Sequence, residues 1–188
     1  DRLYTEKADS KSRRAAQTSI YIILNAMTRM IAPILAYTSD EIWKYMPHSS
    51  DCDPENIVFN TIPEKVAIDL DADFTAKWDK IHDLRDTVKK SIENVRIEKI
   101  IKTSLESAVI LKANGDEYDF LKSIEDELAT IFIVSKVVIE NADVDELVVE
   151  VVKADGEKCE RCWAFSETVG ADENHPTLCK RCAEILKG

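Results

Sequence analysis

The most regular recurrence of apolar side chains lies between residues 74 and 97. There, apolar residues are three or four positions apart, which places them on one face of an α-helix. They are Phe74, Trp78, Ile81, Leu84, Val88, Ile92 and Val95. The same spacing predicts an earlier helix over residues 9–31, which Pro33 ends or kinks. Its apolar positions are Ala16, Ile20, Ile23, Met27 and Met30.

A shorter helix is expected from Ser39 to Met46. Thr38 and Glu41 have the spacing of a capping box, in which each side chain satisfies a backbone N–H at the start of a helix. Pro47 stops this helix. Residues 1–98 are therefore predicted to form an α-helical bundle.

The pattern changes after residue 98. Alternating apolar residues around Val109 predict a strand that ends at the turn pair Asn114-Gly115. Helical spacing returns from Tyr118 to Leu128, and the stretches IVSKVVIE and ELVVEVVKADG are rich in β-branched residues, as strands are. Residues 99–155 are thus expected to form a small α+β domain in the order strand, helix, strand, strand.

Four of the five cysteines lie near the end of the chain, in the spacing C-x2-C-x16-C-x2-C. Two cysteines at i and i+3 on a tight turn can reach one metal ion, and a second such pair completes a tetrahedron. Four thiolates leave no position for a substrate, so one structural zinc ion is predicted in a module over residues 156–188. The expected ligands are Cys159, Cys162, Cys179 and Cys182. The predicted fold class is a mainly α-helical bundle, a small α+β domain and a terminal four-cysteine zinc-ribbon or knuckle module.

The four cysteines could instead form two disulfides or a redox-active pair. The start of the chain helps to decide between these alternatives and zinc, because it indicates the cellular compartment. The first residues are polar, without the features of a signal peptide, and no apolar run approaches the roughly 20 residues that span a bilayer. A cytoplasmic protein without membrane contact is expected, where thiols stay reduced and zinc is favoured. Because the chain starts at Asp1, we expect a fragment or a processed form.

The net charge of −11 by itself argues against a nucleic-acid partner. However, residues 113–155 hold 3 Lys/Arg against 12 Asp/Glu, a net charge of −9. Residues 1–112 hold 17 against 18 and residues 156–188 hold 5 against 6, so each of these segments has a net charge of −1. Both flanking segments can therefore present a locally basic face.

Trp163 directly follows the first cysteine pair and has two interpretations. It either packs over the metal site and the preceding strands, or stacks on an unpaired base, as aromatic side chains do in RNA recognition. Arg161, Lys180 and Arg181 surround the same two cysteine pairs, which favours a nucleic-acid partner.

No nucleotide-binding loop and no arrangement of residues typical of a catalytic nucleophile is found in the sequence. The unassigned residues are His48, His82, His175 in a solvent-facing loop, and Cys52 as an inert exposed thiol.

Several stretches together resemble the C-terminal part of bacterial isoleucyl-tRNA synthetases, a class I family. AQTSIYIILNAMTRMIAPILAYTSDEIWKYMP is similar to the anticodon-binding helices of that family, and NVRIEKIIKTSLESAVIL to the junction into its α/β C-terminal domain. FIVSKV adds to the resemblance, and CERCW…HPTLCKRC is similar to the terminal zinc module. The resemblance covers essentially the whole chain, in order.

The resemblance implies recognition of tRNA(Ile) by part of a larger enzyme. The family joins isoleucine to its tRNA using ATP, and its catalytic and editing domains lie in an upstream region that this chain lacks. We therefore expect ATP to be used only by the parent enzyme, and this chain alone not to activate isoleucine. The helices, truncated at their N-terminus, would contact the anticodon stem and loop through Arg13, Arg14 and Arg29.

By the same resemblance, Arg161 and Trp163 would contact the anticodon, and the acidic α+β domain would be a spacer. A monomer is expected, with tRNA(Ile) and the catalytic and editing domains of the same parent as partners. Two other functions stay open. One is a DNA-binding module, since certain DNA glycosylases end in a zinc finger with similar cysteine spacing. The other is a module in which zinc braces a surface that binds another protein.

Overall fold

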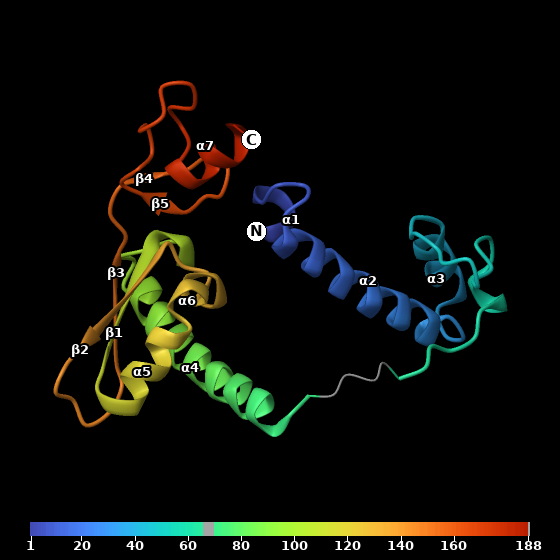
Figure 1. Cartoon of the computed structure of the whole chain (residues 1–188), viewed down its shortest axis with the longest axis horizontal. Coiled ribbons are helices and arrows are strands. Elements are labelled where there is room, and N and C mark those ends of the chain that lie inside the picture. The colour runs from blue at the N-terminus through green and yellow to red at the C-terminus, as the bar shows by residue number, and fades with distance from the viewer. Residues whose placement is uncertain (66–69, 188) are drawn as a thin grey trace. The chain divides into compact units, whose positions relative to one another are not determined.

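The computed structural model describes residues 1–65 and 70–187 and contains two compact units, Asp1–Asp69 and Leu70–Gly188 (Figure 1). The first unit is helical, with α1 (Arg2–Thr5), α2 (Lys11–Ile31), α3 (Ala36–Lys44) and a 3-10 turn, η1 (Ile57–Phe59). The helices of the second unit are α4 (Ala72–Ile97), η2 (Ser104–Glu106, 3-10), α5 (Gly115–Ser123), α6 (Glu125–Phe132) and α7 (Lys180–Lys187). Its strands are β1 (Ser107–Ala113), β2 (Lys136–Asn141), β3 (Val148–Lys153), β4 (Glu157–Lys158) and β5 (Phe165–Ser166). The predicted fold class is confirmed in outline, as helices followed by an α+β region with four cysteines near its end.

Helices α2 and α3 form close to where the sequence predicts them, but the start of α3 differs. The Ser10 hydroxyl caps α2 by accepting a hydrogen bond from the Arg13 N–H at 3.2 Å. Helix α3 begins at Ala36, so Thr38 lies inside its first turn and the predicted capping box was wrong. Leu35 takes the N-cap position instead, where its N–H donates to the Ile31 carbonyl at 2.8 Å, and no side chain caps the helix.

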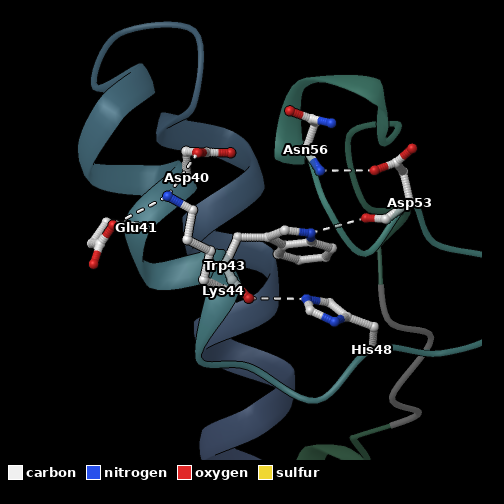
Figure 2. A network of polar contacts seen from close by, with 7 residues as sticks. All are labelled: Asp40, Glu41, Trp43, Lys44, His48, Asp53 and Asn56. Carbon is white, nitrogen blue, oxygen red and sulfur yellow. Dashed lines mark hydrogen bonds and ion pairs between the residues drawn. The ribbon is translucent and has the colours of Figure 1, made fainter.

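Trp43 is the centre of the core of the first unit. Its side chain is fully buried and packs with Ala32, Met46 and Ile57. The indole N–H donates to the Asp53 carbonyl at 2.9 Å (Figure 2). His48, for which the sequence predicts no role, donates from Nε2 to the Trp43 carbonyl at 2.9 Å, because a carbonyl oxygen only accepts (Figure 2). These bonds tie the loop after α3 to the helix.

The second unit is built on a three-stranded sheet in the order β2-β1-β3. Strand β1 pairs parallel to β2 and antiparallel to β3. A parallel pair needs a crossover connection, which α5 and α6 supply. The predicted order of strand, helix, strand, strand is found, except that the single predicted helix is two helices that meet at Ile124.

Helix α4 packs with this sheet. Ile81, Leu84, Val88 and Ile92 are buried in one cluster with residues of β1, among them Val109. The sequence correctly predicts α4 and its apolar face, but it groups this helix with the preceding ones over residues 1–98. In the structure the division into units falls near residue 69 because the apolar face of α4 is covered by the sheet and by α6.

No helix in the parts of the chain that the structure describes is both long enough and apolar enough to cross a bilayer.

The shared core of α4 and the sheet predicts the effect of Leu84→Ala. Leu84 is 5% exposed, and removing a buried leucine side chain costs about 2–5 kcal/mol of unfolding free energy. Ile97→Ala is the matched control on the same helix, since Ile97 is 70% exposed and its loss should cost less than about 0.5 kcal/mol. Urea unfolding of both variants measures the difference. Equal costs would contradict the assigned packing of α4.

Candidate functional site

The four cysteines near the end of the chain lie on two turns that face each other. Cys159 follows strand β4, and strand β5, the antiparallel partner of β4, begins after the turn. Within this turn the Trp163 N–H donates to the Cys159 carbonyl at 2.8 Å, and the Cys159 N–H donates to the Ala164 carbonyl at 2.9 Å. Cys179 directly precedes helix α7, and Cys182 lies in the first turn of that helix. Backbone pairing therefore shapes the first turn, and a helix start shapes the second.

The sulfur atoms of Cys159, Cys162, Cys179 and Cys182 all lie within 4.8 Å of one another. Cys162 Sγ and Cys179 Sγ are 3.9 Å apart. A tetrahedral ion with metal–sulfur bonds of about 2.3 Å needs sulfur–sulfur distances of about 3.8 Å. The four thiols therefore fit one tetrahedral metal ion. The spacing of the cysteines predicts this cluster, and His175 is not part of it.

The surroundings of the sulfurs affect their protonation differently. Burial raises the pKa of Cys159, but backbone N–H groups of Cys162, Cys179 and Arg161 outweigh burial and lower it to about 6. One of these bonds is donated by the Cys179 N–H to Cys159 Sγ at 3.3 Å. Burial raises the pKa of both Cys162 and Cys182. The backbone thus stabilises the Cys159 thiolate, while burial disfavours negative charge on the Cys162 and Cys182 sulfurs.

Trp163 is exposed rather than packed over the cysteines. Its side chain is 60% exposed. Its backbone is in the left-handed region, with φ of 65°, where a residue other than glycine pays about 1–2 kcal/mol. The hydrogen bond from its N–H to the Cys159 carbonyl holds this conformation. The turn therefore keeps a large aromatic side chain at the surface where glycine would fit more easily.

Lys158 is a basic residue of this site that the sequence analysis missed. Its ammonium lies 5.2 Å from the centre of the Trp163 ring, a distance at which a cation and an aromatic face attract each other. Lys158 directly precedes the first cysteine, so the sequence does place it next to the cysteine pair. It does not show that Lys158 lies opposite the Trp163 ring, because that placement depends on the β4–β5 pairing.

The three basic residues predicted around the cysteine pairs have different surroundings. Lys180 is exposed at the start of α7, and Arg161 is partly buried between the first two cysteines. Burial lowers the pKa of Arg181, but the adjacent Cys162 and Cys182 sulfurs outweigh burial and raise it. Arg181 therefore offsets negative charge on the cysteine cluster.

Two segments of the chain match known protein families. Residues 1–111 match the family described as the anticodon-binding domain of tRNA ligase. Residues 156–185, which hold the four cysteines, match the family described as a zinc finger found in FPG and IleRS.

The chain belongs to the anticodon-binding domain family of tRNA ligases.

Several relatives of this chain are isoleucine–tRNA ligases. It is 44% identical to the isoleucine–tRNA ligase of Moorella thermoacetica over 100% of this chain and 21% of the relative. It is 45% identical to that of a Thermoanaerobacter species, again over 100% of this chain and 21% of the relative. For Geobacillus kaustophilus the identity is 41%, over 99% of this chain and 21% of the relative. The chain therefore spans about a fifth of the length of these curated relatives.

The arginines of the first unit that were predicted to contact RNA also form hydrogen bonds within that unit. Arg14 is exposed and donates to the side chain of Gln17 at 3.2 Å. Arg13 donates to the Glu6 carbonyl at 3.2 Å. Arg29 lies 5.3 Å from the Trp43 ring centre and donates to Cys52 Sγ at 2.8 Å.

Cys52 is therefore half-buried and bonded, not the exposed inert thiol that was expected. The Ser49 hydroxyl lies 3.1 Å from the same sulfur. Since Arg29 also donates to the Thr61 carbonyl at 3.2 Å, its guanidinium links α2 to the loop after α3. The sequence could not reveal this, because the groups involved are far apart along the chain.

Gly156 is the residue whose replacement should disturb the site most selectively. A Cβ at this position would lie 2.2 Å from the Ser166 carbonyl carbon, and its φ is +86°. Gly156→Ala is therefore expected to separate β4 from β5 and to cost roughly 2 kcal/mol or more. Hydrogen exchange of the Cys159 amide measures this opening.

Gly115→Ala is the matched control for that experiment. Its φ is +51°, but a Cβ there would meet no atom within 4 Å. Only the cost of the left-handed backbone, about 1 kcal/mol, should appear, and exchange at Cys159 should not change. Faster Cys159 exchange in the control, or none in Gly156→Ala, would contradict the close approach.

Proposed function

We propose that this chain is the tRNA-recognising part of an isoleucine–tRNA ligase, an enzyme that joins isoleucine to tRNA(Ile) using ATP. The anticodon-binding match over residues 1–111 and the names of the relatives support this role. Since the chain spans about a fifth of those relatives, ATP and isoleucine would be handled elsewhere in the parent enzyme. The cytoplasmic location and the monomeric state stay predictions.

One zinc ion would be held by Cys159, Cys162, Cys179 and Cys182. The four sulfurs within 4.8 Å of one another and the zinc-finger match of residues 156–185 support this. Zinc prefers four thiolates in structural sites and supplies folding free energy there. The role of the ion is to fix the two cysteine turns, and with them the residues between the ligands.

The observation that carries the proposal is the exposed, backbone-strained Trp163 beside the cysteine cluster. An aromatic ring that is 60% exposed offers a face on which an unpaired base can stack. Lys158 and Lys180 lie on the same small module, and Arg161 follows between the first two ligands. Together these residues combine a stacking surface with the positive charge that phosphates require.

In the first unit, Arg14 is the arginine best placed to meet phosphate, because it is exposed and its guanidinium donates to the neutral side chain of Gln17. Arg13 and Arg29 would contribute less, since their guanidinium groups also bond within the unit. Their role in binding the anticodon stem and loop stays part of the proposal.

The exposed apolar face of α2 supports the proposed partnership with the catalytic and editing domains of the parent enzyme. Met27 is 55% exposed and Met30 61%, and Ile34, in the turn after α2, is 82% exposed. Ile20 and Ile23 continue this surface at 48% and 58% exposure. Large contiguous apolar surfaces are usually covered by another protein surface. Packing by the rest of the same polypeptide would cover this face.

Two other functions are less well supported. The zinc-finger family includes FPG as well as IleRS, so the cysteine module alone does not distinguish tRNA from DNA. The match of residues 1–111 to an anticodon-binding domain favours tRNA. If the zinc-braced surface bound only protein, the chain would not bind tRNA even at low salt.

Trp163→Gly separates a binding role from a structural one. Glycine adopts a positive φ without steric cost, so the turn and its zinc content should be retained. Loss of one stacked base, worth about 1–3 kcal/mol, should weaken binding to a tRNA(Ile) transcript roughly 5- to 150-fold. Fluorescence anisotropy measures the affinity, and metal analysis measures the zinc.

Trp163→Phe is the control, because it keeps a ring for stacking and should retain most of the affinity. Unchanged affinity in Trp163→Gly would remove Trp163 from the interface. Loss of zinc together with affinity would show that the tryptophan supports the fold instead.

Cys179→Ser tests the role of the cluster. Removing one of four ligands should release zinc and unfold residues 156–187. The core residues around the cysteines are separate from those of α4 and the sheet, so most helix content should remain. Circular dichroism and metal analysis check both results. Retention of one zinc per chain, or unfolding of α4, would contradict this assignment.

A further inference from the structure

The cysteine module and the sheet of the second unit have separate apolar clusters. The cluster of the module consists of the cysteines with Val169 and Leu178. The cluster under the sheet contains residues of α4, β1, α5 and α6, and shares none with the module. Apolar packing within these two clusters therefore does not by itself fix the orientation of the module on the sheet.

Ser135 joins the two parts through its hydroxyl group. The Phe165 N–H, in strand β5 of the module, donates to Ser135 Oγ at 2.7 Å. The same hydroxyl donates to the Leu105 carbonyl, just before strand β1. The Ser135 N–H donates to the Ser107 carbonyl at 3.1 Å. Ser135 is thus held by its backbone to the first residue of β1 and by its hydroxyl to the turn before β1, and the same hydroxyl binds the backbone of the module.

Strained backbone lies on both sides of this joint. Ile133, two residues before Ser135, has φ of 61°, a value that β-branched residues rarely adopt. Trp163, two residues before Phe165, has φ of 65°. Such conformations persist only where the surrounding structure holds them, and they concentrate at functional sites. Both chain segments are therefore bent just before the residues that meet.

We propose that Ser135 is a positioning residue for tRNA recognition, which holds the cysteine module on the sheet in the orientation that presents Trp163. This inference rests on the proposed function. Ser135 would not touch the RNA. Without its hydroxyl, the module would spend only part of its time in the binding orientation, and the apparent dissociation constant would rise by the inverse of that fraction.

Ser135→Ala tests the proposal in the whole chain. Loss of the acceptor leaves the Phe165 N–H without this partner, and we expect about tenfold weaker binding to a tRNA(Ile) transcript. No charge is removed, so the dependence of affinity on salt should keep its slope. The Phe165 amide should exchange with solvent about tenfold faster, while zinc content stays at one ion per chain.

Two further variants sharpen the result. Ser135→Thr keeps the hydroxyl and should restore both the affinity and the slow exchange at Phe165. Ser123→Ala is the matched control, since the Ser123 hydroxyl donates to the Phe120 carbonyl at 2.7 Å within its own segment. This control should change neither the affinity nor the exchange at Phe165.

The outcomes separate this inference from the proposed function. If Trp163→Gly weakens tRNA binding but Ser135→Ala does not, the positioning role is wrong and the proposed function stands. If Trp163→Gly has no effect on tRNA binding, the proposed function fails, while the exchange rate of Phe165 still shows whether the joint holds the module. Loss of zinc in Ser135→Ala, or no rescue by threonine, would reduce Ser135 to a residue of general stability.

Discussion

The convergence of four cysteine sulfurs is the constraint on which the end of the chain depends. Residues 156–187 contain only short strands and one short helix, and their apolar cluster is made mostly of the cysteines themselves. A segment this small buries too little apolar surface to fold well alone, and a metal ion is the usual supplement. The proposed zinc ion would therefore determine whether Arg161, Trp163 and Lys158 are held in place.

The same constraint explains why strain is tolerated at Trp163. Its positive φ is maintained by a hydrogen bond within the first cysteine turn, and a closed metal site would hold that turn. Residues around the cluster then divide by role. Arg181 offsets the charge of the sulfurs, whereas Trp163 and Lys158 face solvent, where an RNA can approach. In this account one short segment supplies both a structural metal site and a binding surface, because the cysteine ligands and the proposed RNA-contacting residues alternate along it.

The sequence predicted the helices, the strands and the cysteine cluster well. It predicted less well which distant residues each of them contacts. Spacing alone predicted helix α4 and its buried residues, because periodicity reports which face of a helix is apolar. It did not reveal that the sheet covers that face, since long-range packing leaves no local pattern. The capping box at Thr38 failed for a related reason, because the turn after α2 places Leu35 at the N-cap and starts α3 two residues before Thr38. The role of Ser135 and the internal bonds of Arg29 were not predicted, because each residue acts through groups distant in sequence.

The central claim is that a metal-held cysteine module lets this chain recognise the anticodon of tRNA(Ile). The most direct measurement is the affinity of the chain for tRNA(Ile) and for the same tRNA with a replaced anticodon, before and after removal of zinc by a chelator. The account predicts a preference for the cognate anticodon that disappears with the metal and returns when zinc is restored. Equal affinity for the two tRNAs in the zinc-loaded chain, or a preference that survives chelation, would contradict it.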